Sequence, residues 1–413
     1  MATFRYTVGP WNVHEGNETF GPGNRKSVPF EEKIKKFAEI GIDGIQFHDD
    51  DAVPDMNNMT EKQIIDYAKD VKSELDKYGL FAEFVAPRLW FDKRTNDGGF
   101  TASLKSDRDF AMWRAQRSCD IAAALGTNKI QLWLAREGTL CAESKSPVDM
   151  TNNLIDAFNQ ILKYREDALI LVEPKPNEPV DRSIAGTAGH ALAIGAQTVD
   201  PSRVGLCIET AHSVLAGLDP ANDMGFALAM NKLWGVHLND QNGIRYDQDK
   251  TFGVENLRNA FNQVKVLYEN NFGDRGNFEC VGLDVKALRT QPDEDCYRHI
   301  INSKRICELL LEKVKRFDYE FQAACVKEQN FEKLEMYVME LLMGLVYLFA
   351  TPKEANYYIG YRCYYGMGSV EAWRFTQKLA GIVFALLGLL SGIAVLLVSG
   401  GFSGMDTMDL LWK

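Results

Sequence analysis

Short runs rich in β-branched and aromatic residues alternate along this chain with longer amphipathic stretches. This order predicts parallel strands joined by helices, because two neighbouring parallel strands need a long crossover connection, which is usually a helix. Eight such runs can be counted before residue 290. They lie near residues 4–11, 43–50, 80–86, 128–134, 168–174, 203–210, 233–240 and 277–286.

Helical stretches fill the gaps between these runs. The segment FEEKIKKFAEIG at 30–41 ends on a glycine, and the segment 254–270 carries Leu257, Phe261 and Val264 at helical spacing. Eight strand–helix units in series predict an α/β fold, a (β/α)8 or TIM barrel. A chain of 413 residues is long enough for this barrel and an appendage. In such a barrel, chemistry belongs at the carboxyl ends of the strands.

Acidic residues and histidines stand where the later runs end. An ionised group beside an apolar strand is costly unless a cation or an opposite charge compensates it. Oxygen-dominated ligands favour Mg²⁺, Mn²⁺ or Co²⁺ over a structural zinc. The residues in question are Glu173, Glu209, His212, Asp247, Asp249 and Asp284.

Asp247 and Asp249 alternate in the segment YDQD. If this segment is extended, both side chains point to the same side and can converge on one ion. A polar loop without a ligand is the alternative.

Several motifs occur together, in one order, over most of the chain. They are FHDDD at 47–51, REG at 136–138, EPKPNEP at 173–179, GHALA at 189–193, QNGIRYDQD at 241–249 and DVK with RT at 284–290. By these motifs, residues 1 to about 343 resemble the xylose isomerase family of sugar isomerases. The resemblance implies a metal-dependent aldose–ketose isomerase that converts D-xylose to D-xylulose by a 1,2-hydride shift after ring opening. L-rhamnose or another aldose is the alternative substrate.

The resemblance also implies two divalent cations per subunit, Mg²⁺, Mn²⁺ or Co²⁺. The first would be held by Glu173, Glu209 and Asp284, and the second by Glu209, His212, Asp247 and Asp249. His237, in GVHLND, stands where most xylose isomerases carry an aspartate. This arrangement is similar to the L-rhamnose isomerase branch, so we expect His237 to bind the first cation. A histidine packed at the barrel mouth without a cation is the alternative.

The same resemblance assigns the residues that handle the sugar. His48 with Asp51 matches the family's ring-opening pair, for which a helix-capping loop is the alternative. Lys175 matches the lysine that hydrogen-bonds the terminal oxygens of the sugar. The remaining substrate-binding residues implied are Lys286, Trp11, Trp90, Trp133 and Phe20, the last reaching into the pocket of a neighbouring subunit. Surface positions for the lysines and core packing for the tryptophans are the ordinary alternatives.

Composition limits the function classes. A formal net charge of −11 argues against a broad nucleic-acid footprint, and with it against a metal-dependent DNA-repair nuclease on the same barrel. Of the six histidines, His14, His190 and His299 lie outside the expected ligand and ring-opening residues. Eight dispersed cysteines without a CxxC pair and an amino end without a signal sequence predict reduced thiols and a cytoplasmic barrel.

The carboxyl-terminal part changes in composition. Residues 379–399 form a run of 21 positions without a charge, which predicts one transmembrane helix; a buried helix is the alternative. Residues 358–381 resemble a segment of small Sdp-immunity-type membrane proteins. The domains expected are a barrel at 1–317, a short helical extension at 318–345 and a membrane-associated tail at 346–413.

The flanking charges predict how this tail is oriented. Arg362, Arg374 and Lys378 precede the apolar run, so we expect an anchor in the cytoplasmic membrane with the barrel inside. The family resemblance implies a homo-oligomer, a dimer or a tetramer. A membrane-tethered, non-catalytic sugar-binding protein is the alternative function of another class.

Overall fold

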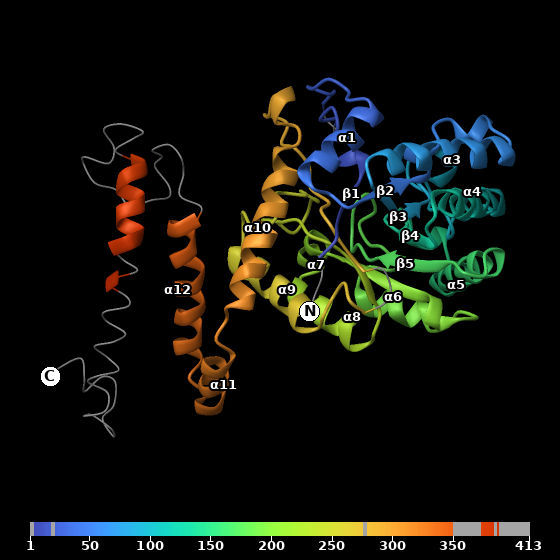
Figure 1. Ribbon diagram of the computed structural model, residues 1–413. Coiled ribbons are helices and arrows are strands. Elements are labelled where there is room, and N and C mark those ends of the chain that lie inside the picture. Colours follow the sequence, from blue (N-terminus) through green and yellow to red (C-terminus); the bar gives the residue numbers. More distant parts are fainter. Residues whose placement is uncertain (1–3, 18–20, 276–278, 350–372, 384–385, 388–413) are drawn as a thin grey trace. The chain divides into compact units, whose positions relative to one another are not determined.

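The computed structural model describes the backbone of residues 4–17, 21–275, 279–349, 373–383 and 386–387. The chain divides into two compact units, Met1–Arg316 and Phe317–Lys413. The first unit is a barrel of strands surrounded by helices, and the second unit is helical where it is described (Figure 1).

Eight parallel strands close into the barrel, each pairing with the next and β8 pairing with β1. This confirms the predicted (β/α)8 barrel, and every strand lies inside one of the eight predicted runs. The strands are β1 (Tyr6–Val8), β2 (Gly44–His48), β3 (Phe81–Ala86), β4 (Lys129–Trp133), β5 (Leu169–Glu173), β6 (Val204–Glu209), β7 (Leu233–His237) and β8 (Cys280–Gly282).

Helices surround the strands of the first unit (Figure 1). Their apolar faces are buried; in α9, for example, Phe261, Val264 and Leu267 are at most 1% exposed. Gly41 ends α1 in the left-handed conformation, with φ of 82°, which glycine adopts without strain. The helices are α1 (Phe30–Ile40), α2 (Asp49–Ala52), α3 (Glu61–Lys77), α4 (Lys105–Leu125), α5 (Pro147–Tyr164), α6 (Ala188–Gly195), α7 (Thr210–Leu215), α8 (Pro220–Ala229), α9 (Leu257–Glu269) and α10 (Arg298–Lys315).

The strand register brings candidate site residues to one end of the barrel. Trp133 pairs with Glu173, Glu209 pairs with His237, and His237 also pairs with Gly282. Glu173, Glu209 and His237 are therefore the last residues of three consecutive strands, and Asp284 follows β8 by two residues. Parallel strands present their carboxyl ends to the same side, so these side chains meet there.

The second unit contains α11 (Tyr319–Glu328) and α12 (Phe331–Phe349). Asp318 caps α11 by accepting a hydrogen bond from the Phe321 amide at 2.8 Å, and its own amide donates to the Tyr337 hydroxyl at 2.9 Å. The rings of Phe317 and Phe321 both contact Tyr337, with centroids 5.4 Å and 5.0 Å apart. An aromatic cluster therefore joins the two helices.

The predicted transmembrane helix lies mostly outside the residues that the structure describes. Of residues 379–399, only 379–383 and 386–387 are described. Among the helices that are described, none combines the length and apolarity that crossing a bilayer requires. The predicted span is thus not supported by the described part of the chain.

Candidate active site

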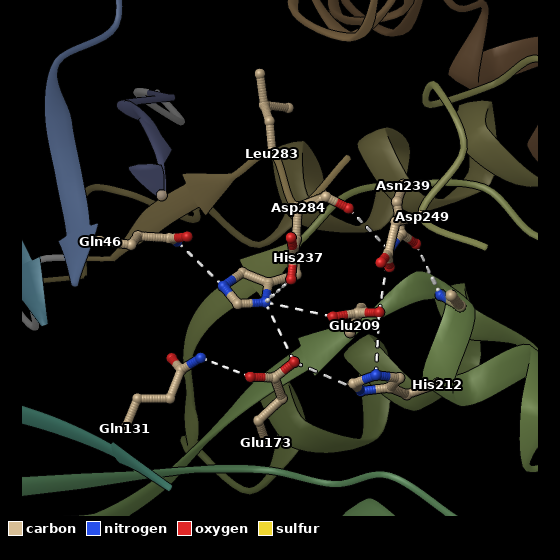
Figure 2. A network of polar contacts seen from close by, with 12 residues as sticks. Gln46, Gln131, Glu173, Glu209, His212, His237, Asn239, Asp249, Leu283 and Asp284 are labelled. Atoms are coloured by element: carbon tan, nitrogen blue, oxygen red, sulfur yellow. Dashed lines mark hydrogen bonds and ion pairs between the residues drawn. The ribbon is translucent and has the colours of Figure 1, made fainter. Parts of the chain in front are cut away.

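A buried histidine faces three carboxylates where β5, β6, β7 and β8 end (Figure 2). His237 Nδ1 lies 3.3 Å from Glu173 Oε1, 3.4 Å from Glu209 Oε2 and 3.8 Å from Asp284 Oδ2. His237, Glu173 and Glu209 are at most 3% exposed. The structure thus brings together the set predicted for the first cation, including His237.

A second cluster shares Glu209 with the first. His212 Nε2 lies 3.2 Å from Glu209 Oε1 and 3.0 Å from Asp247 Oδ2. Its Nδ1 lies 3.5 Å from Glu173 Oε1. Because the two oxygens of Glu209 face different histidines, this one carboxylate joins the two groups that were predicted to hold separate ions.

Asp249 does not join the second cluster as predicted from an extended segment. Its backbone φ is 45°, in the left-handed region, so Asp247 and Asp249 do not follow the alternation of a strand. Asp249 instead contacts the ammonium of Lys286 and accepts a hydrogen bond from Asn239 Nδ2 at 3.1 Å. Lys286 is thus a cationic partner of Asp249. This ion pair is a physical reason why the Asp249 carboxylate does not join the second cluster.

Asp247 has a lysine partner of its own. Lys175 Nζ donates to Asp247 Oδ2 at 2.8 Å and lies 3.2 Å from Glu178 Oε2. It also lies 4.8 Å from the centre of the Trp133 ring. Lys175 and Lys286, both predicted to meet the sugar, therefore contact the aspartates that were predicted to bind metal.

Neutral side chains orient the carboxylates, and the sequence analysis missed them. Gln131 Nε2 donates to Glu173 Oε2 at 2.6 Å. Asn239 Nδ2 donates to Glu209 Oε1 at 3.0 Å, while its Oδ1 accepts from the Ala211 amide at 2.9 Å. Amide side chains carry no charge pattern, but the position of Asn239, two residues after the end of β7, was a usable signal.

Asp284 is held by the short helical turn Pro10–Asn12 that follows β1. Trp11 Nε1 donates to Asp284 Oδ1 at 2.9 Å. Asn12 Nδ2 donates to the same oxygen at 3.3 Å and to the carbonyls of Leu283 and Val285 at 3.0 Å and 2.8 Å. Trp11, predicted as a wall of the sugar pocket, therefore also orients a candidate metal ligand.

Burial and mutual repulsion set the charges of this site. Burial raises the pKa of Glu209 to about 8, and the neighbouring Asp247 and Glu173 add to this rise. Burial also raises the pKa of Asp249 well above its usual range, helped by Asp247. For Glu173, burial is outweighed by His237 and His212, which hold its pKa at about 2.

The pKa values of the two histidines are also raised, but here neighbouring groups rather than burial cause the rise. Burial disfavours a charged His237, but Cys207 and Glu173 raise its pKa well above the usual value. Glu209 and Asp247 likewise overcome burial and raise the pKa of His212. Bound protons and the ammonium groups of Lys175 and Lys286 thus compensate the negative charge of the carboxylates.

The predicted ring-opening pair is formed on the neighbouring side of the barrel mouth. His48 Nδ1 lies 2.7 Å from Asp51 Oδ2, within hydrogen-bond distance. Arg88, which the sequence analysis missed, donates from Nη2 to Asp51 Oδ1 at 2.8 Å and lies 2.7 Å from His48 Nδ1. Burial raises the pKa of Asp51, but His48 and Arg88 outweigh it and hold the pKa at about 2. An ionised carboxylate therefore orients the imidazole.

Aromatic rings surround this pair. The Trp11 ring lies 4.1 Å from the His48 ring, and the Trp90 ring meets His48 edge-on at 5.1 Å. Trp133 meets Trp90 edge-on at 4.5 Å. The three predicted tryptophans thus come together, whereas Phe20 lies outside the described residues.

A family model described as a xylose isomerase-like TIM barrel matches residues 34–271, more than half of the chain. The chain belongs to this family. The match covers β2 to β7 and therefore His48, Glu173, Glu209 and His237.

Solved structures share the fold of this xylose isomerase-like barrel at low identity. A D-tagatose 3-epimerase-like protein is 16% identical, with 75% of this chain and 100% of that chain covered and a TM-score of 0.55. An L-ribulose 3-epimerase is 14% identical, with 76% and 96% covered and a TM-score of 0.54. The IOLI protein, solved with a binding zinc atom, is 12% identical, with 75% and 99% covered and a TM-score of 0.52.

A second family model matches the tail. It describes the SdpI/YfhL protein family and covers residues 353–411, in agreement with the resemblance noted for residues 358–381. The match spans a small part of the chain, and most of these residues lie outside the described ranges.

The clusters of this xylose isomerase-like barrel fit divalent cations. Each offers carboxylate oxygens and one imidazole nitrogen from a buried or half-buried position. Asp247 Oδ1 is buried and has no hydrogen-bond partner among the described residues. A buried acceptor without a partner costs free energy that a cation would recover.

Proposed function

We propose that this protein is a metal-dependent aldose–ketose isomerase, with D-xylose as its first candidate substrate. The observation that carries the proposal is the pair of carboxylate–histidine clusters joined by Glu209, close to a preformed His48–Asp51 pair. Paired cation sites with a shared carboxylate suit reactions in which two neighbouring oxygens change charge.

The side chains of the site are suited to the individual steps of this isomerisation. His48, held by Asp51, can pass a proton between the ring oxygen and the anomeric hydroxyl, which opens the sugar ring. A bound divalent cation would supply Lewis-acid polarisation of the sugar oxygens. The hydrogen on C2 then moves with its electron pair to C1, O2 loses a proton and O1 gains one. The reaction balances without an external oxidant or reductant.

Lys175 is suited to charge that develops on the terminal oxygen. Its side chain is 3% exposed, and its ammonium contacts Asp247 and Glu178, which raise its pKa although burial opposes them. A cation kept charged in a dry site stabilises a developing oxyanion more strongly than one in water. The rings of Trp90 and Trp133 would exclude water and cover the apolar C–H face of the sugar.

A second candidate is the epimerisation of a ketose. The solved structures with TM-scores of 0.55 and 0.54 are named as a D-tagatose 3-epimerase-like protein and an L-ribulose 3-epimerase. His237 also differs from the aspartate of most xylose isomerases. Epimerisation returns a proton to the opposite face of one carbon, so it requires acid–base groups on both faces and no hydride shift.

The test is chelation of the purified protein, addition of Mg²⁺, Mn²⁺ or Co²⁺, and assay against aldopentoses, aldohexoses, deoxyaldoses and ketoses. We expect chelation to abolish aldose–ketose conversion and a divalent cation to restore it. Retention of the C2 hydrogen in the product would support the hydride shift. Conversion that persists in excess chelator would contradict the proposal, and epimer formation from ketoses alone would favour the second candidate.

A matched pair of variants locates the cations. Glu209→Gln removes the shared charge and should reduce cation stoichiometry at both clusters. Glu279→Gln is the control, because Glu279 is also 1% exposed but accepts a hydrogen bond from the Gly273 amide, away from the clusters. If no sugar reacts but sugars still bind, the non-catalytic, membrane-tethered alternative replaces both enzymes.

A further inference from the structure

Polar side chains from four strands occupy the interior of the barrel, where branched apolar residues are usual. All are at most 4% exposed. They are Thr7 on β1, Gln46 on β2, Glu83 on β3 and Lys129 on β4. Burying such groups is costly, so each needs a partner.

These side chains contact one another and reach His237. Thr7 Oγ1 donates to Glu83 Oε2 at 2.5 Å, and Gln46 Nε2 donates to the same oxygen at 3.0 Å. Lys129 Nζ lies 3.9 Å from Glu83 Oε1 and donates to the Trp234 carbonyl at 3.2 Å. Gln46 Nε2 lies 3.1 Å from His237 Nε2 (Figure 2). The imidazole is therefore contacted from both nitrogens.

The contact between Gln46 and His237 requires glycine at position 282. A Cβ there would lie 2.4 Å from Gln46 Nε2 and 2.6 Å from His237 Cδ2. The Val236 carbonyl would be 3.1 Å away, which is also a tight contact. Gly282 thus provides the space in which the amide meets the ring.

The two nitrogens of His237 have different tasks. Nδ1 faces the carboxylates of Glu173 and Glu209, so a lone pair on Nδ1 is what a cation would bind. The ring proton must then sit on Nε2, where it needs an acceptor. Gln46 Oε1 is buried and has no hydrogen-bond partner among the described side chains. A half-turn of the amide would present this oxygen to Nε2.

We propose that Gln46, anchored by Glu83, is a positioning residue that accepts the Nε2 proton of His237 and keeps Nδ1 free for a divalent cation. In this orientation Oε1 lies beside Glu83 Oε2. Thr7 Oγ1, which lies 3.2 Å from Gln46 Nε2 and 2.5 Å from Glu83 Oε2, would then place its hydroxyl between the two oxygens. The inference rests on the cation site of the proposed function but not on sugar turnover.

The test is calorimetric titration of chelated protein with Mn²⁺ and Mg²⁺. Gln46→Met keeps the size of the side chain and removes the acceptor, so affinity should fall by about 10- to 100-fold, the usual effect of losing a partner behind a metal ligand. Glu83→Gln keeps the size of the side chain and replaces the carboxylate by an amide, which can donate a hydrogen bond to Gln46 Oε1. Its affinity should stay within about threefold, well short of that loss.

Gln263→Met is the matched control. Gln263 is 1% exposed and accepts a hydrogen bond from Thr210 Oγ1 at 2.7 Å, but it does not contact His237. Its cation affinity should equal that of the unmodified protein. Equal affinities in Gln46→Met and Gln263→Met would overturn the inference. If the unmodified protein binds no cation, the proposed function fails as well.

A measurement on the unmodified protein covers the case in which Gln46→Met does not fold. In protein labelled with ¹⁵N-histidine, the His237 signals can be assigned by comparison with His237→Asn. With saturating Mg²⁺, we expect the ring proton on Nε2, protected from exchange by Gln46. A proton on Nδ1 in the cation-bound protein would overturn the assignment.

Discussion

Asp51 illustrates how one carboxylate can act without touching the clusters. Its two oxygens receive hydrogen bonds from His48 and Arg88, so its charge is satisfied on both sides. His48 Nδ1 is thereby directed toward Asp51, and the opposite nitrogen is left for the sugar. A change at Asp51 should affect ring opening and leave cation binding intact.

Asp51→Asn should lower kcat/KM for cyclic aldoses by about 100-fold or more, the usual contribution of a positioned acid–base group. An aldose supplied in its open-chain form should react at nearly the normal rate. Stopped-flow assays of both forms measure the difference. Asp55→Asn, at an exposed position shortly after α2, is the control. Equal losses on both forms would show that Asp51 has only a structural role.

The buried His299 provides a prediction of how the stability of the barrel depends on pH. It lies on α10, is 3% exposed, and donates from Nε2 to the Asn12 carbonyl at 3.0 Å. Burial lowers its pKa to about 4, although the Asn12 carbonyl opposes this shift. In the unfolded chain a histidine titrates near 6.5, so the unfolded state binds more protons between these two values. The stability contributed by neutral His299 is present above pH 6.5 and is lost as pH falls through 4.

His299→Gln keeps the donor to Asn12 and removes the titration. The free energy of unfolding of the unmodified protein should fall by about 3 kcal/mol more than that of the variant between pH 6.5 and 4. Urea unfolding at several pH values tests this. His190→Gln is the control, because His190 is exposed. Parallel pH profiles for His299→Gln and the unmodified protein would contradict the prediction.

At the scale of elements, the sequence predicts most of the barrel. Parallel strands are buried on both faces, so they read as short apolar runs, and all eight strands lie within those runs. Strand ends also located Glu173, Glu209 and His237. The direction of the Asp249 side chain was harder to predict, because the left-handed backbone of a loop residue leaves no periodic signal in the sequence.

The polar interior could not be predicted for a different reason. Gln46 and Glu83 meet only through the register between β2 and β3, and a chain pattern does not state which residues face across a closed barrel. The second role of Trp11 depends in the same way on the closure of β1 against β8. Closure of the ring is tertiary information.

Gly282 tests the close approach of β8 to the interior. Gly282→Ala should lower the free energy of unfolding by roughly 1–3 kcal/mol, because the added methyl group would overlap Gln46 and His237. Urea denaturation measures this loss. Gly243→Ala is the control, since a Cβ at Gly243 meets nothing within 4 Å. An unchanged midpoint for Gly282→Ala would show that the interior can expand.

At the scale of the whole molecule, the barrel and the carboxyl-terminal tail match different families. Residues 353–411 match the SdpI/YfhL family model, whereas the barrel belongs to the xylose isomerase-like family. We propose that residues 379–399 tether a cytoplasmic barrel to the membrane, although none of the described helices could span it. The uncharged run of 21 residues supports this proposal.

Fractionation of cells that express residues 1–413 or residues 1–343 tests the tether. The full-length protein should pellet with membranes and resist salt extraction, because apolar insertion is insensitive to ionic strength. The shorter protein should stay in the supernatant. Size-exclusion chromatography of the shorter protein also tests the expected dimer or tetramer. Full-length protein in the supernatant would contradict the membrane proposal.

The four residues of the first cluster come from β5, β6, β7 and its neighbour β8, which follow one another in the chain. A cation bound there would directly link only the second half of the barrel, β5 to β8. Successive ligands lie 28 to 47 positions apart in the chain, and the entropy of closing such segments grows only slowly with their length. The His48–Asp51 pair belongs to the first half of the barrel, so the bound cation would not stabilise it directly. The cation would therefore stabilise the β5–β8 half of the barrel directly, and the ring-opening pair only through the rest of the fold.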